Sequence, residues 1–87
     1  MKLSIIELPN LSRPWLLKRE HGKYEQHAHF YTEKAARKCR ALIDARKYPY
    51  SEEFLVAMRR ILTDQEMNRL RRKQHYTNIN KGAMNYR

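Results

Sequence analysis

The alternation of side chains from residue 14 to residue 31, followed at once by helical spacing, constrains the fold of this chain most strongly. Successive side chains of a strand point to opposite faces. One face of a hairpin that turns near Gly22 therefore collects Trp15, Leu17, Ala28 and Phe30. Beyond Thr32, a residue suited to cap a helix, apolar residues recur at a spacing typical of one helix face. These are Ala35, Ala36, Cys39, Leu42 and Ile43. The stretch predicts a β-hairpin that packs on an amphipathic helix.

The charges beside Gly22 predict how the two strands of the hairpin are aligned. A two-residue turn at His21 and Gly22 is favoured, because glycine takes positive φ freely and histidine is enriched there. This register pairs Glu20 with Lys23, Lys18 with Glu25, and Leu16 with His27. Opposite charges facing each other across strands stabilise a hairpin by a few tenths of a kcal/mol. A turn one residue later would set Glu20 against Glu25, so we predict the first register.

The whole chain predicts an α+β fold: an antiparallel sheet followed by three helices. We expect strands at about 2–8, 14–20 and 23–31, and helices at about 33–47, 52–62 and 64–76. Pro49 is expected to end the first helix, and Ser51 to cap the second. Thr63 and Glu66 form a capping box that starts the third. The predicted core comprises Trp15, Phe30, Cys39, Leu42, Ile43, Phe54, Met58 and Leu62.

Length and composition predict a single small domain over residues 1–76, with a basic and mobile tail at 77–87. The net charge is +10 in 87 residues, which points to an anionic partner, with nucleic acid first and an acidic protein second. The single cysteine, Cys39, forms no disulfide within the chain and suits a reducing compartment. No stretch is apolar enough to cross or anchor in a membrane. We therefore expect a cytoplasmic protein without a membrane partner.

No catalytic constellation is visible in the sequence. The glycines are Gly22 and Gly82 alone, so no glycine-rich loop cradles a phosphate. His27 and His29 have a spacing that suits zinc, but a tetrahedral site needs four ligands, and Cys39 lies on the far side of the predicted sheet contact. We expect no catalytic residue, no metal and no cofactor, and therefore no enzyme.

The predicted binding residues are basic side chains on the first and third helices. On the first helix they are Lys34, Arg37, Lys38 and Arg40, and on the third they are Arg69, Arg72, Lys73 and Tyr76. The third set recurs at i, i+3, i+4 and i+7, away from Met67 and Leu70. No acidic residue follows Glu66, and cations interleaved with an aromatic ring suit a phosphate backbone with a stacked base.

The layout of three short strands and a helix resembles the small arm-binding modules that begin phage-type tyrosine recombinases, which lay their sheet in the major groove. In the predicted register, Glu20 and Glu25 offset the lysines of the hairpin, so we place the binding surface on the helices instead. The sequence thus predicts an accessory or regulatory nucleic-acid-binding protein (DNA or RNA), of the kind found in phages and mobile elements. The alternative is an inhibitor or adaptor whose basic face docks on an acidic surface of a larger nucleic-acid-processing protein.

Overall fold

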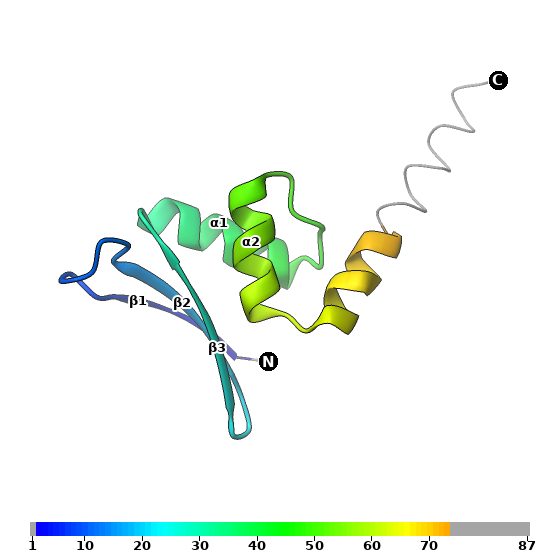
Figure 1. The fold of residues 1–87 in the computed structure, drawn as a ribbon, viewed down its shortest axis with the longest axis horizontal. Coiled ribbons are helices and arrows are strands. Elements are labelled where there is room, and N and C mark those ends of the chain that lie inside the picture. The colour runs from blue at the N-terminus through cyan, green and yellow to red at the C-terminus, as the bar shows by residue number, and fades with distance from the viewer. Residues whose placement is uncertain (1, 74–87) are drawn as a thin grey trace.

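The computed structural model describes residues 2–73, which form an antiparallel sheet followed by helices (Figure 1). The strands β1 (Lys2–Glu7), β2 (Trp15–His21) and β3 (Tyr24–Phe30) lie in the order β1-β2-β3. Helix α1 (Glu33–Asp44) and helix α2 (Glu52–Ile61) precede a third helix, described over residues 64–73. The α+β prediction is confirmed. The predicted helix beyond residue 73 and the tail at 77–87 lie outside the described residues.

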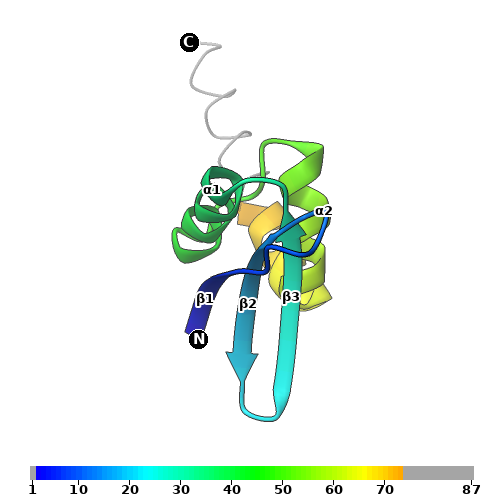
Figure 2. The same cartoon turned by 90° about the vertical axis from the view of Figure 1, so that its left-hand side faces the viewer.

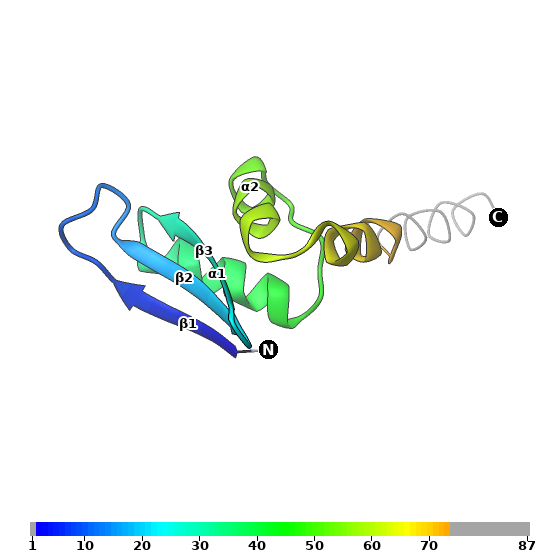
Figure 3. The ribbon, with the colours of Figure 1, turned by 60° about the horizontal axis from the view of Figure 1, so that its bottom comes forward.

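Among residues 2–73, the helices lie on one face of the sheet and leave its other face uncovered (Figures 2 and 3). Between the two layers lies one apolar core, in which Leu17, Phe30, Cys39, Met58 and Ile61 are at most 1% exposed. The third helix adds Met67 and Leu70 to this core. Of the predicted core residues, Trp15 and Leu42 are only partly buried and flank the cluster. The sheet and helices therefore stabilise each other through shared apolar contacts.

The observed hairpin register differs from the predicted one by two residues. His21 pairs with Tyr24, so Gly22 and Lys23 form the turn and Glu20 lies opposite Glu25. Gly22 alone has positive φ there, at 59°, as in a turn that places glycine at its first central position. This turn spares His21 the cost of a left-handed conformation. A shift of two residues keeps every side chain on its predicted face, so the predicted faces are correct.

Lys18 explains how the hairpin tolerates two opposed glutamates. Its Nζ lies 2.9 Å from a carboxylate oxygen of Glu25 and 3.3 Å from one of Glu20. Hydrogen bonds to Glu25 and then Glu20 raise the pKa of Lys18 above its ordinary value. One cation thus offsets both acids, an arrangement that counting only directly opposed pairs does not reveal.

Side-chain caps start the helices where the sequence predicts. The hydroxyl of Thr32 accepts from the amide of Ala35, and that of Ser51 accepts from the amide of Phe54. The end of α1 was predicted too late, because the helix stops at Asp44, before the turn to Pro49. Arg46 there takes positive φ, at 55°. The helix therefore ends at the left-handed conformation of Arg46, before it reaches Pro49.

Candidate nucleic-acid interface

The predicted capping box at the start of the third helix is confirmed. The Glu66 amide donates to the Thr63 hydroxyl at 3.2 Å, and the Thr63 amide donates to Glu66 Oε1 at 2.9 Å. These two bonds satisfy amides that the first helical turn leaves without partners. They begin the helix in a defined phase, with Met67 and Leu70 turned into the core.

Arg19 of β2 ties this helix start to the sheet. Its guanidinium donates to both carboxylate oxygens of Glu66, at 2.8 and 3.1 Å, and to the Ile61 carbonyl at 3.2 Å. Arg19 is 8% exposed, so the pair is largely shielded from water. This bonding to Arg19 is the main reason that the pKa of Glu66 falls to about 2. The end of α2 and the start of the third helix are thereby held against one strand.

Two buried polar side-chain atoms near the ion pair of Arg19 and Glu66 have no hydrogen-bond partner within the described residues. They are Arg19 Nε and Gln26 Oε1, a donor and an acceptor on directly opposed residues of β2 and β3. The sequence analysis did not find the link between Arg19 and Glu66, which are 47 residues apart. The available signal was a charged residue on the hairpin face predicted to be covered, since a buried charge is seldom left unpaired.

The third helix presents its predicted cations to solvent. Arg69, Arg72 and Lys73 are exposed, opposite the buried Met67 and Leu70. Tyr76, the remaining member of that predicted face, lies outside the described residues. The side of the helix that carries Arg69 and Arg72 contains no acid between residues 67 and 73. This surface can make charge-assisted hydrogen bonds to phosphate oxygens.

The predicted cations of α1 are all exposed but differ in their partners. Arg37 Nε donates to Glu33 Oε1 at 2.7 Å, and Arg40 Nε lies 3.8 Å from Asp44 Oδ2; both pairs have the i, i+4 spacing that brings side chains together on a helix. Within the part of the chain that the structure describes, Lys34 and Lys38 form no ion pair. These two lysines are therefore the α1 cations more readily available to an external anion.

Two further exposed cations, Arg46 and Lys47, lie in the segment after α1 and were not among the predicted binding residues. Figures 1 and 3 both place this segment beside the start of the third helix. The amide of Lys47 donates to the Leu42 carbonyl and that of Arg46 to the Ile43 carbonyl. This bonding pattern usually has glycine in the left-handed position that Arg46 occupies. Because no glycine marks this position, the sequence did not indicate that the helix ends here. The exposure of Arg46 and Lys47 was therefore not predicted.

On the open face of the sheet near the hairpin turn, Lys18 is already bound to Glu20 and Glu25. His27 and His29 touch edge to face, with ring centroids 5.3 Å apart. Across residues 2–73, no cluster of three or more histidine, cysteine or carboxylate side chains could hold a metal ion. Burial raises the pKa of the Cys39 thiol to about 12, so at neutral pH it remains protonated and a poor nucleophile.

The geometry defines a small α+β protein whose sheet is covered on one face by helices with exposed cations (Figure 2). No helix within the described residues is long and apolar enough to span a membrane. No family model, no curated protein and no solved structure matches the chain.

Proposed function

We propose that this protein binds nucleic acid through the phosphate backbone, using lysine and arginine side chains of α1, the segment after α1, and the third helix. The observation that carries this proposal is the acid-free, exposed side of the third helix with Arg69 and Arg72. Since that helix is anchored to the sheet through Glu66 and Arg19, these cations are presented on a rigid support. A pre-positioned cation loses less conformational freedom when it meets a phosphate.

The other cations should contribute to binding to different extents, because some of them already form ion pairs within the protein. Lys34 and Lys38 would contact phosphate directly, whereas Arg37 and Arg40 would first have to give up Glu33 and Asp44. Arg46 and Lys47 would extend the contact toward the third helix. Sequence-independent contacts of this kind suit an accessory or regulatory protein that acts on duplex or single-stranded nucleic acid.

The proposal is tested by removing two cations from the third helix. In Arg69→Gln with Arg72→Gln, affinity for a fluorescent 20-nucleotide duplex should fall by on the order of tenfold or more near 0.1 M salt. The slope of log K against log salt should become shallower by about 2. Fluorescence anisotropy across a salt series measures both, and thermal unfolding should be nearly unchanged because both sites are exposed.

A matched control removes the same charge from a surface outside the proposed interface. Lys2→Gln with Lys23→Gln takes two exposed cations from β1 and the hairpin turn, so it should lower affinity only slightly. If both double variants weaken binding equally, only the net charge matters and the third helix is no interface. If neither duplex nor single strand binds at all, the inhibitor or adaptor that docks on an acidic protein surface becomes the better proposal.

A further inference from the structure

Strand β3 has a free outer edge in the part of the chain that the structure describes. The sheet order is β1-β2-β3, and no strand pairs with the far side of β3. Hydrogen-bonded and non-bonded pairs alternate in an antiparallel ladder, so counting from the turn directs the amides and carbonyls of Glu25, His27 and His29 outward. These groups can accept one more strand.

This edge lacks the usual protection against another strand. Natural edge strands carry lysine, proline or a bulge. Strand β3 reads Tyr-Glu-Gln-His-Ala-His-Phe, without lysine or proline, and its pairing with β2 is unbroken from Tyr24 to Phe30. Figure 2 shows α2 behind β3, on the side of this free edge. A single strand therefore fits beside β3 more readily than a second sheet does.

A groove of about 650 Å³ runs along this edge between β3 and α2. Its walls include His29, Phe30 and Tyr31 from β3 and the residues that follow, and Val56 and Ala57 from α2. Val56 is 45% exposed and Tyr31 is 61% exposed, so the groove has apolar surface open to solvent. Of the residues whose backbone groups point outward, His29 lies in the groove itself.

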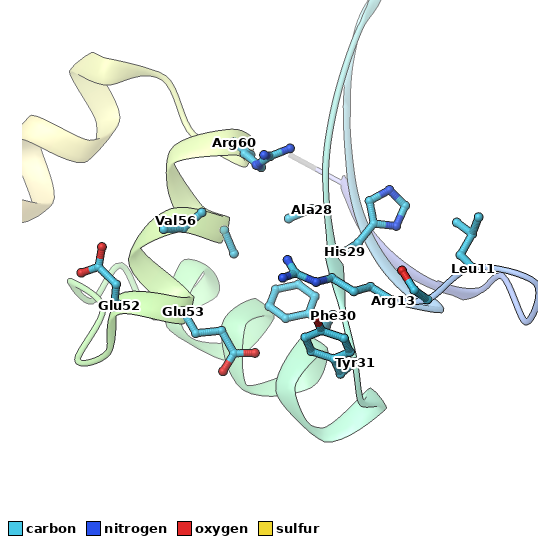
Figure 4. A pocket seen from close by; sticks show the side chains of 12 residues that line it. Leu11, Arg13, Ala28, His29, Phe30, Tyr31, Glu52, Glu53, Val56 and Arg60 are labelled. Carbon is cyan, nitrogen blue, oxygen red and sulfur yellow. The ribbon is translucent and has the colours of Figure 1, made fainter.

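Charges of opposite sign mark the two ends of the groove (Figure 4). Glu53 points toward Tyr31, while Arg60 reaches toward β3 at the other end. The two residues are about 10 Å apart along the axis of α2. Arg13 from the β1–β2 loop lies 4.6 Å above the Tyr31 ring, near the Glu53 end. Figure 4 shows Glu52 pointing away from β3, so Glu53 is the acid that faces the groove there. Within the described residues Glu53 forms no ion pair, with Arg13 or any other cation, so its carboxylate can accept a cation of a bound peptide.

We propose that this groove binds an extended peptide that adds to β3 as a fourth, antiparallel strand. Helix α2 runs opposite to β3, so an antiparallel peptide enters at Glu53 and leaves at Arg60. Residues two apart in a strand share a face, and four residues span about 13 Å. The long side chains of Glu53 and Arg60 bridge the small difference in length. The preferred peptide has a basic residue, an apolar residue two positions later and an acidic residue two positions after that.

Residues 67–87 do not have the preferred sequence of this peptide. No aspartate or glutamate occurs among them, so none of their side chains offers a carboxylate to Arg60. The proposed occupant is a segment of another protein that carries one. This site is separate from the cations of α1 and the third helix, so its test is independent of nucleic-acid binding.

The test compares two fluorescent ten-residue peptides that differ only in direction of charge. One contains Lys-Thr-Val-Thr-Glu and the other Glu-Thr-Val-Thr-Lys, with the same Ser-Gly flanks. The full-length protein should bind the first about tenfold more tightly by anisotropy, since the second turns two attractions into repulsions. Amide resonances of His29, Tyr31 and Val56 should shift in NMR spectra. Equal affinity for both peptides, or shifts elsewhere, would overturn the proposal.

Two variants and one modified peptide check the geometry. Glu53→Gln with Arg60→Gln should bind both peptides equally, and Glu53→Arg with Arg60→Glu should prefer the second. Both sites are exposed, and thermal unfolding confirms that each variant folds. N-methylation of the peptide amides that face β3 should abolish binding, whereas methylation of the alternate amides should not. Unchanged preference in the folded variants, or no effect of either methylation, would refute strand addition.

Discussion

Arg19 is the residue on which the arrangement of the helices depends most directly. It lies on the helix-covered face of β2, on the same face as Leu17 and opposite Gln26, and is only 8% exposed. Burying a charge is costly unless it is paired and hydrogen-bonded, and here Glu66 and the Ile61 carbonyl provide both. Removing one partner of such a pair leaves an uncompensated buried charge.

Acid should therefore weaken the fold through Glu66. Its pKa is about 2 in the folded protein, against 4.5 ordinarily. A lowered folded-state pKa gives stability that is fully present above about pH 4.5 and is lost as pH falls toward 2. The pKa difference alone corresponds to about 3 kcal/mol, and solvent screening of this partly exposed carboxylate makes the loss smaller. Chemical denaturation across this pH range measures it. Glu66→Gln keeps a residue that suits the capping box but removes the charge that pairs with Arg19. This variant should therefore be less stable than the natural protein at pH 7, and its stability should depend less on pH between 4.5 and 2.

At the scale of single elements, the end of α1 combines a strained backbone with an exposed cation. Arg46 has positive φ in a position that usually holds glycine, and its side chain points to solvent. A left-handed conformation costs a residue with a side chain about 1–2 kcal/mol. Such strain at an exposed position motivates a functional hypothesis for the side chain.

Arg46→Gly should consequently have opposite effects on stability and binding. Stability should rise by about 0.5–1 kcal/mol, because the relieved strain exceeds the chain entropy that glycine adds. Nucleic-acid affinity should fall, with a salt slope shallower by about 1. Urea denaturation and anisotropy give the two values. Arg46→Lys should retain binding, and an unchanged salt slope for Arg46→Gly would remove this residue from the interface.

At the scale of the whole molecule, a small core holds the sheet and the helices together. Phe30 is 1% exposed at the end of β3, where the chain turns into α1 and where α2 packs on the strand. Trp15, its cross-strand partner, is only partly buried at the rim of the core. The two aromatic residues should therefore differ in their contribution to the free energy of unfolding.

Truncating these two side chains tests this difference. Phe30→Ala should cost about 3–5 kcal/mol, enough to unfold much of a domain this small at 25 °C. Trp15→Ala should cost about 2 kcal/mol, since part of its surface remains in water in the native state. Circular dichroism during thermal unfolding measures both variants. Equal losses would mean that the sheet and helices share a core centred elsewhere than at Phe30.

The sequence by itself determined which elements form and which face each one buries. Alternation and helical spacing are local patterns, so the strands, the helices and the caps at Thr32, Ser51 and Thr63 could be predicted from neighbouring residues. The exposure of Arg69 and Arg72 followed in the same way, because the capping box sets the phase of the third helix. Two local features were predicted wrongly. The hairpin register differs because Lys18 contacts two acids rather than one, and α1 ends early because Arg46 takes a left-handed conformation.

Only the tertiary structure decided how these elements meet. The bond between Arg19 and Glu66 joins residues 47 apart, and no local pattern specifies such a partner. The groove beside β3 exists because α2 packs next to a strand edge that nothing else in residues 2–73 covers. Contacts of this kind depend on chain path and packing, which are cooperative properties of the whole molecule. Periodicity in a sequence reports burial of a face but not the identity of what covers it.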